Sequence, residues 1–512
     1  MLAKRIKSFF KIDDSYNTVI ISLLLTALVC FASYNAFISY GFNSPDGILE
    51  GFHYYTNRHW ALAGCGRWFL ALINNAHANI VAPWLTIMEC CFVNWLSAYS
   101  ICKILDINKK SHIYILCVFF SIIPTFIEIN LYTNSAFSYS ISVLLSILFV
   151  YFNLKKSYLY SIVSAICLGC AMGSYQSQIG IAVGLTVICM IRKILENEKT
   201  LVFIIKSLIS GLLGLLVYIV GLNICLSIYH LELASRAASF SISEVINRFP
   251  NSILNVFYAF FNTYNQIILK RKYLFLLIAV VFVIELIVLI YRIIKNKEYS
   301  KFIVIILIVV LPIAFNFIGI ILPMFEITPL MLTPNYLFIF FVFYLLTYID
   351  FNYSKVISVI ICMLMLMLSW TYVLSANATY ESYKLSYNTY KSQFASALNM
   401  VYQLDGYEHD VTQIAVVGYP SDQALRDNIK TYNYAIGLHS NLLYWQTFDL
   451  DFTSTYYYLL NEFSIDTGVT EVDYYRGIVL NPDVKNMPCW PNPNSVQMIN
   501  GYAVIKFGEP NE

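Results

Sequence analysis

The feature that most constrains this chain is the recurrence of long apolar runs. About eleven of them approach the ~20 residues that a helix needs to cross a bilayer. Lipid offers the backbone no hydrogen-bond partner, so each spanning run must be helical. We therefore predict an α-helical polytopic membrane protein, with spans at residues 16–38, 81–103, 113–131, 134–153, 158–174, 177–191, 204–228, 273–291, 302–322, 335–349 and 355–374.

Charge is scarce and unevenly placed along the chain. Only 12% of the 512 residues are charged, about half of the share that soluble domains carry. Residues 15–45 and 158–191 contain no Asp, Glu, Lys or Arg. The net charge is +2 and there is no basic tail, so the composition predicts the lipid bilayer as a partner and excludes nucleic acid. Most of the twelve cysteines lie in apolar runs, where they act as small hydrophobes, and we expect no metal site.

Lysine and arginine gather in alternate loops. The opposite short loops, near Tyr132, Tyr175 and Thr328, contain none. Because positive charge stays on the cytoplasmic side of a membrane, we predict a cytoplasmic N-terminus, and an odd number of spans places the C-terminus outside. The basic loops are at residues 4–11, 103–110, 155–156, 192–199, 292–301 and 355.

Residues 158–191 allow two interpretations. As one helix they would extend roughly 50 Å, which exceeds a hydrocarbon core of about 30 Å. As two short helices that turn at residues 173–178, they keep the basic loops on one side. A single tilted helix would instead place residues 292–301 outside. The charge pattern favours the pair of helices.

Two domains are expected from the change in composition. Residues 1–374 form a transmembrane domain with outer loops at 39–80 and 229–272. Residues 375–512 are polar and rich in tyrosine, with a helix pattern at 380–404 and strand patterns at 413–419 and 502–507. Alternating helix and strand patterns predict a small α/β domain. It lies outside the cytoplasm in this topology and carries no catalytic motif.

The first outer loop concentrates the side chains that carry chemistry. Asp46 and Glu50 are four residues apart and share a face if the segment is helical, and such a carboxylate can remove a proton from an attacking hydroxyl. Arginine can hold a phosphate with two hydrogen bonds, and tryptophan suits the membrane interface. The alternative is an ordinary interfacial loop in which Asp46 caps a short helix. The candidate substrate-binding residues of this loop are Arg58, His59, Arg67 and Trp68.

Other candidates lie near the same predicted outer surface. Tyr175 and Gln176 belong to the polar turn at 173–178, whose simplest role is to satisfy that turn. Glu128 lies near the outer end of its span. Arg271 and Lys272 are basic residues at the outer start of a predicted span, where the positive-inside rule predicts few. They could anchor the span at the headgroups or bind a lipid phosphate.

Two more carboxylates, Glu89 and Glu285, are expected deeper in the membrane. An ionisable group there is by default a functional hypothesis, and no basic residue nearby in sequence is an obvious partner for either. Because these two carboxylates could form a proton or cation pathway, a transporter remains an alternative to an enzyme.

The chain resembles the GtrII-type glucosyltransferase family. The resemblance rests on the first outer loop with Asp46, on Gly66-Arg67-Trp68, on Gly173-Ser-Tyr-Gln, and on Met487-Pro before a final strand at 500–507. Such proteins are bacterial and similar to the broader GT-C group. The resemblance implies transfer of glucose or a related sugar from undecaprenyl phosphate to O-antigen or another envelope glycan, on the outer face of the cytoplasmic membrane.

The resemblance also implies a mechanism. Asp46 corresponds to the catalytic base, and the reaction would be a direct displacement that needs no nucleotide or redox cofactor. Many relatives have paired acidic residues here, whereas this chain has Pro45-Asp46-Gly47, so Glu50 is a candidate for the second carboxylate. The alternatives are a flippase of lipid-linked glycan and an O-antigen polymerase or ligase. Transporters often have interrupted helices in two repeats, and we see one interruption, at 173–178.

Overall fold

The computed structural model describes residues 15–40, 59–77, 82–233, 242–263, 273–321, 327–349, 354–435, 455–456, 458–460, 462–470 and 473–509. The chain divides into two compact units. We call Met1–Ser39 with Asn57–Asn377 the membrane unit, and Tyr40–Thr56 with Ala378–Glu512 the C-terminal unit.

Eight helices in the described part of the chain are long and apolar enough to cross a membrane, and three shorter apolar helices accompany them. Together they occupy the predicted spans, so the predicted fold class is confirmed. The longer ones are α2 (Ser15–Tyr40), α6 (Pro83–Ile104), α7 with α8 (Lys110–Ser121, Pro124–Ile129), α9 (Thr133–Asn153), η2 with α11 (Gln176–Gln178, Ile179–Leu195), α12 (Leu201–Tyr229), α15 (Tyr273–Lys295) and α19 (Ser354–Val401).

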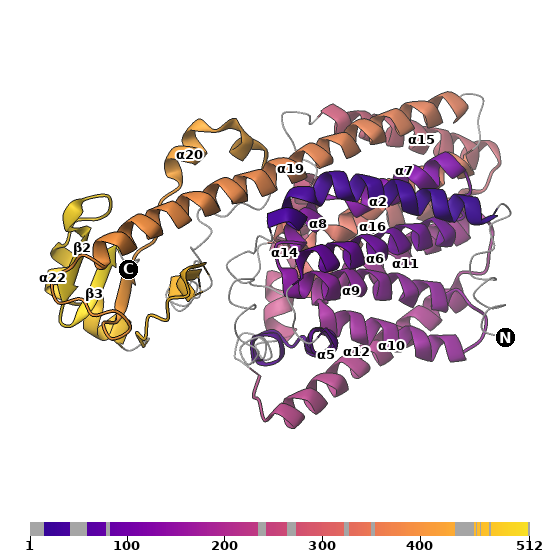
Figure 1. The fold of residues 1–512 in the computed structure, drawn as a ribbon. Coiled ribbons are helices and arrows are strands. Elements are labelled where there is room, and N and C mark those ends of the chain that lie inside the picture. Colours follow the sequence, from indigo (N-terminus) through magenta and orange to yellow (C-terminus); the bar gives the residue numbers. More distant parts are fainter. Residues whose placement is uncertain are drawn as a thin grey trace. The chain divides into compact units, whose positions relative to one another are not determined.

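The shorter apolar helices and the connecting turns complete the membrane unit. The three short apolar helices are α10 (Leu159–Ser174), η3 with α16 (Tyr299–Phe302, Ile303–Phe315) and η5 with α18 (Thr333–Tyr336, Leu337–Tyr348). The other elements are η1 (His59–Gly64), α5 (Trp68–Ala76), α14 (Ile242–Thr263), α17 (Ile318–Ile321) and η4 (Pro329–Met331). Helix α9 packs against α6, α10 and α11, which run beside it (Figure 1).

Residues 158–191 form two helices. Helix α10 ends at Ser174, because Tyr175 is extended (φ −155°, ψ 107°) and interrupts the helical backbone. Helix α11 begins after the short turn η2. Both helices pack against α9. The prediction of two helices with a turn at 173–178 is therefore confirmed.

Small and polar residues allow α9, α10 and α12 to approach one another closely. A Cβ at Gly169 of α10 would lie 2.5 Å from Cγ1 of Val217 on α12. Asn153 Nδ2 donates to Ser164 Oγ at 2.7 Å, and Ser210 Oγ donates to Asn153 Oδ1 at 3.0 Å. Membrane helices associate through small residues and interhelical hydrogen bonds, because an apolar face gains little over lipid. These contacts fix the three helices relative to one another.

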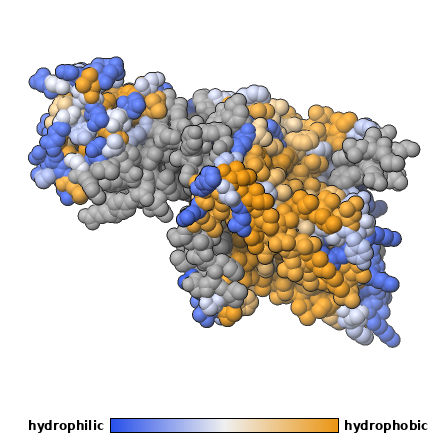
Figure 2. Space-filling view, turned by 90° about the horizontal axis from the view of Figure 1, so that it is seen from below, coloured by the Kyte–Doolittle hydropathy of each residue, from blue (hydrophilic) through white to orange (hydrophobic). Residues whose placement is uncertain are grey.

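Apolar side chains cover the outside of the membrane unit. Figure 2 shows a broad hydrophobic surface with hydrophilic side chains along its border. Leu212 and Leu216 of α12 and Leu276 of α15 are among the exposed apolar residues. A contiguous apolar surface of this kind faces lipid rather than water.

Helix α19 joins two segments that the sequence predicted as separate, the span at 355–374 and the helix at 380–404. It runs without interruption from Ser354 to Val401. The reason is local: no glycine or proline occurs within it, and these are the residues that most strongly end a helix.

The C-terminal unit is built on a three-stranded mixed sheet with the order β1-β3-β2. β1 (Ile414–Val417) pairs in parallel with β3 (Tyr502–Lys506), and β2 (Val496–Ile499) pairs with β3 in the antiparallel sense. Asn500 and Gly501 both have positive φ, as the tight turn between β2 and β3 requires. The other elements of this unit are α20 (Gln423–Asn428), η6 (Lys430–Tyr434), η7 (Asp473–Ile478), α22 (Pro482–Asn486) and η8 (Pro493–Ser495).

Candidate active site at one end of the membrane unit

Arg67 lies against two stacked tyrosine rings. Its guanidinium carbon is 4.9 Å from the ring centroid of Tyr175 and 5.5 Å from that of Tyr139. The two rings stack with centroids 4.4 Å apart, and Arg67 Nη1 donates to the Tyr139 hydroxyl at 2.7 Å. A desolvated cation over an aromatic face gains about 2 kcal/mol. The guanidinium is therefore oriented by α9 and by the turn after α10.

The loop that leads to this arginine is fixed by Gln176. Its Nε2 donates to the backbone oxygen of Cys65 at 2.7 Å and to the Tyr218 hydroxyl at 3.3 Å. Gly66 has φ +66°, and a Cβ there would lie 2.8 Å from the Tyr218 hydroxyl oxygen. Both the left-handed backbone and the close approach favour glycine.

Trp68 fills the space between α10 and α12. Its side chain is 8% exposed. A Cβ at Gly173 would lie 2.6 Å from Trp68 Nε1, and a Cβ at Gly221 would lie 2.6 Å from Trp68 Cε2. Leu222 and Cys225 of α12 belong to the same buried cluster. The indole is thus seated against two helix backbones where only glycine leaves room for it.

The motif Gly66-Arg67-Trp68 and the motif Gly173-Ser-Tyr-Gln therefore meet in space. Cys65 and Gln176 are 111 residues apart in the chain and are joined by a hydrogen bond. Both motifs lie at the end of the bundle where α10 finishes and α9 and α11 begin. The opposite ends of these helices carry the basic turns at 155–156 and 192–199.

Several buried polar atoms near this end of the bundle have no hydrogen-bond partner within the described residues. Glu128 is 3% exposed and lies in α8, shortly before α9 begins. A buried polar atom without a partner costs about 1–3 kcal/mol, so such a group indicates a place for water or a ligand. The unpartnered atoms are Trp68 Nε1, Glu128 Oε2, Asn130 Oδ1, Asn134 Nδ2, Ser174 Oγ and Gln178 Oε1.

The structure brings together four of the predicted site residues, namely Arg67, Trp68, Tyr175 and Gln176. Glu128 lies at the same end of the bundle, in α8. The predicted catalytic residues Asp46 and Glu50, and the predicted binding residues Arg58, Arg271 and Lys272, lie outside the described residues. His59 begins η1, and its side chain also lies outside the description.

Three residues of the site had no signal in the sequence. Tyr139, Tyr218 and Gly221 lie inside apolar spans, where they look like ordinary components of a membrane helix. Among the described residues, no group of three or more His, Cys, Asp or Glu side chains is placed to hold a metal ion.

The two deeper carboxylates have different environments. Contrary to the sequence-based expectation, Glu89 has a basic partner: His77 Nε2 lies 3.6 Å from Glu89 Oε1. The sequence missed the pair because the two residues come from different helices. Glu285 is fully buried, and both of its carboxyl oxygens have no hydrogen-bond partner in the described part of the chain.

The fold and the site define a polytopic helical membrane protein with an arginine held at one end of its bundle. The chain belongs to the glucosyl transferase GtrII family, whose sequence profile matches residues 36–332. It is accordingly a membrane glycosyltransferase that acts on a donor and an acceptor. No curated protein and no solved structure shows significant similarity to the chain.

Proposed function

We propose that this glycosyltransferase moves glucose or a related sugar from a polyprenyl-phosphate-sugar, such as undecaprenyl-phosphate-glucose, to an envelope glycan. The observation that carries the proposal is the Arg67 guanidinium, held by Tyr139 and Tyr175 at the end of an apolar bundle. A lipid-linked donor has the matching chemistry, because its chain requires an apolar surface and its phosphate requires a cation.

Arginine suits this role better than lysine does. Its planar guanidinium forms two parallel hydrogen bonds with a phosphate. The aromatic rings and the Tyr139 hydroxyl fix its direction before the donor arrives, so little side-chain entropy is lost on binding. Arg271 and Lys272 are candidates for further contacts with the same phosphate.

The proposed reaction is a direct displacement. The carboxylate of Asp46 takes the proton from a hydroxyl of the acceptor glycan while that oxygen attacks C1 of the donor sugar. The bond between C1 and the phosphate oxygen breaks, and polyprenyl phosphate leaves with both electrons of that bond. The product is a glycoside of inverted configuration. Glu50 is the alternative base.

Arg67 acts on the leaving group in this scheme. Negative charge on the phosphate grows as the C1–O bond breaks, and a fixed cation stabilises that charge more strongly in the transition state than in the bound donor. Trp68 and Gln176 hold the loop that carries the arginine. Glu128 is buried, its Oε2 has no hydrogen-bond partner within the described residues, and it is a candidate contact for hydroxyl groups of the sugar.

The outer face of the bacterial cytoplasmic membrane is the proposed location of the reaction. The Arg67 end of the bundle is opposite the turns that contain Lys155, Lys156 and Lys193. Basic loops stay in the cytoplasm, and this supports an outer location for Arg67. The odd number of predicted spans supports an extracytoplasmic location for the C-terminal unit.

The test is a reconstituted transfer reaction with polyprenyl-phosphate-glucose and a purified envelope glycan. We expect free polyprenyl phosphate and a new glycosidic linkage in equal amounts, both detected by mass spectrometry. Movement of the intact lipid-linked sugar across the bilayer without a new linkage would identify a flippase instead. Polymerisation of the glycan without consumption of the lipid-linked glucose would identify a polymerase or ligase.

A further inference from the structure

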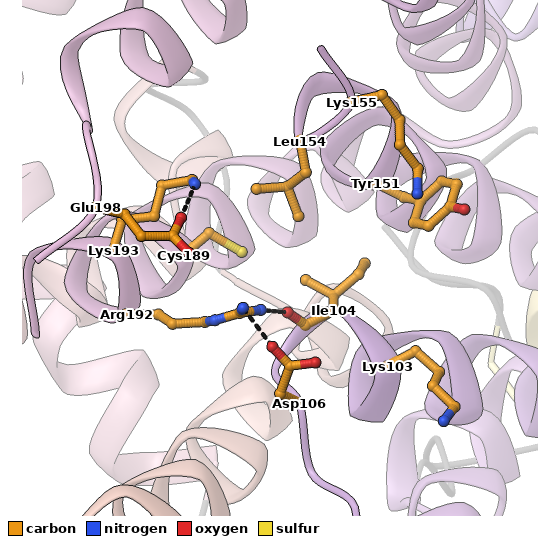
Figure 3. A pocket seen from close by; sticks show the side chains of 10 residues that line it. All are labelled: Lys103, Ile104, Asp106, Tyr151, Leu154, Lys155, Cys189, Arg192, Lys193 and Glu198. Atoms are coloured by element: carbon orange, nitrogen blue, oxygen red, sulfur yellow. Dashed lines mark hydrogen bonds and ion pairs between the residues drawn. The ribbon is translucent and has the colours of Figure 1, made fainter. Parts of the chain in front are cut away.

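A pocket lies at the other end of the same helices, away from Arg67. Its volume is about 260 Å³. It lies between the ends of α6, α9 and α11 and the turns that follow them (Figure 3). The lining residues are Lys103, Ile104, Asp106, Tyr151, Leu154, Lys155, Cys189, Arg192, Lys193 and Glu198.

Two of its basic residues are already neutralised. Arg192 pairs with Asp106 and with Glu196, and it also donates to the backbone oxygen of Ile104. Lys193 pairs with Glu198. The contacts of Arg192 and Lys193 within the lining are drawn in Figure 3. The contacts of Arg192 with Asp106 and Ile104 join the ends of α6 and α11, whereas Lys193 and Glu198 pair within the end of α11 and the turn that follows it.

The other two basic residues contact aromatic rings. Lys103 Nζ lies 5.7 Å from the ring centroid of Tyr99, and Lys155 Nζ lies 4.2 Å from that of Tyr151. Within the described residues, no carboxylate forms an ion pair with Lys103 or Lys155. Four basic and two acidic side chains line the pocket, so its surface has an excess of positive charge.

The backbone around the pocket is held rigidly. Lys206 Nζ donates to the backbone oxygens of Lys155 at 2.7 Å and Lys156 at 3.3 Å, which fixes the turn after α9. Ile107 N donates to the oxygen of Cys102 at 2.9 Å, which closes the turn after α6. Lys155 therefore projects from an anchored turn, and Lys103 from the last turn of α6.

We propose that this pocket binds the phosphate of an anionic membrane lipid, through Lys103 and Lys155. An anion suits the pocket, because neither lysine forms an ion pair within the described residues, basic side chains outnumber acidic ones in the lining, and phosphate is the common anion at a membrane surface. Figure 2 shows that the hydrophobic surface of the membrane unit ends in hydrophilic side chains along its border. Lys103 and Lys155 lie where α6 and α9 end, which suits the depth of a headgroup. Basic pockets between helices at the cytoplasmic border are suited to such headgroups.

The site is separate from the Arg67 site, so it can be tested independently of sugar transfer. The full-length protein in neutral detergent is titrated with phosphatidylglycerol, with zwitterionic phosphatidylcholine, and with inorganic phosphate. Bound lipid is counted by native mass spectrometry, and thermal unfolding is followed in parallel. We expect saturable binding of phosphatidylglycerol that raises the unfolding temperature, and no such effect from phosphatidylcholine.

Matched variants assign the binding to the two lysines. Each lysine near a membrane surface is worth about 1 kcal/mol, or roughly fivefold in affinity. Lys155→Gln should therefore weaken phosphatidylglycerol binding about fivefold, and Lys103→Gln with Lys155→Gln more than tenfold. Lys156→Gln is the control, because Lys156 is an exposed neighbour that does not line the pocket. Lys155→Arg should retain binding.

Three results would overturn the proposal. Equal binding of phosphatidylglycerol and phosphatidylcholine would mean that the charge is not recognised. An equal loss in Lys155→Gln and Lys156→Gln would mean that the pocket is not the site. Saturable binding of inorganic phosphate with the same variant dependence, and no preference for the lipid, would assign the pocket to a soluble phosphate instead.

Discussion

The indole of Trp68 occupies the space that a side chain at position 173 would need. A Cβ on Gly173 would come within 2.6 Å of Trp68 Nε1, a distance that requires one of the two helices to move. The tryptophan begins α5, directly after Arg67, and the glycine lies in the last turn of α10, two residues before Tyr175. The position of Arg67 therefore depends on this contact.

Gly173→Ala should lower both stability and transfer activity. The added methyl group overpacks a filled site, which typically costs about 1–3 kcal/mol, and it shifts the loop before Arg67. The measurement is thermal unfolding in detergent together with the transfer rate. Gly211→Ala is the matched control, because a Cβ at Gly211 meets no atom within 4 Å. If both variants behave like the wild type, Trp68 is not held by Gly173.

Tyr139→Phe removes the hydroxyl that accepts from Arg67 but keeps the aromatic ring beside the guanidinium. The ring remains stacked, but the hydrogen bond from Arg67 Nη1 at 2.7 Å is lost. Hydrogen bonds to charged groups are worth about 1.5–3 kcal/mol, so we expect the KM for the lipid donor to rise about tenfold or more while kcat changes less. Steady-state kinetics with the donor varied will check this.

Arg67→Ala should raise the donor KM further than Tyr139→Phe does and should also lower kcat, because the charge on the leaving phosphate loses its partner. Arg67→Lys should restore only part of the activity, since lysine lacks the planar pair of donors. Full activity of Arg67→Lys would mean that a point charge suffices, and full activity of Arg67→Ala would remove Arg67 from the reaction.

Asp46→Asn tests the proposed base. A general base contributes on the order of 10²–10⁴ in rate, so the variant should lose that much activity while its expression and membrane insertion stay normal. Pro45 and Gly47 flank Asp46 and favour an exposed turn, so the substitution should not destabilise the fold. Glu50→Gln is assayed alongside. Loss in Glu50→Gln alone would reassign the base, and full activity in both would leave this loop as an interfacial anchor.

Reporter fusions test the proposed topology. Fusions after Thr56 and Ser375 should read as extracytoplasmic, and fusions after Lys109 and Lys297 as cytoplasmic. The physical reason is the concentration of lysine and arginine in alternate loops. A cytoplasmic reading at Ser375 would contradict an odd number of spans. Since α10 and α11 are separate helices, the error would then lie in whether each of them crosses the bilayer.

Local sequence patterns were enough to predict most of the helices. The length of an apolar run is set by bilayer thickness, so the spans from α2 to α18 appear where the apolar windows placed them. The break at Tyr175 was also visible, because a polar turn interrupts an uncharged segment. Within the C-terminal unit, β1 and β3 were predicted, whereas the short β2 and the unbroken α19 were missed. The strand β2 is defined by its pairing with β3, which is a tertiary contact. The continuity of α19 has a local cause, since the helix contains no glycine or proline.

The sequence by itself determined that this chain is a helical membrane protein and that Arg67, Trp68, Tyr175 and Gln176 are candidates for its site. Only the tertiary structure decided that these residues meet, and that Tyr139, Tyr218 and Gly221 complete their surroundings. The pairing of Glu89 with His77 and the pocket at Lys103 and Lys155 likewise depend on which helices are neighbours. Hydrophobicity places a helix in the membrane but is nearly uniform around it, so it does not select the face that packs. That choice comes from glycines, stacked rings and hydrogen bonds between segments far apart in the chain.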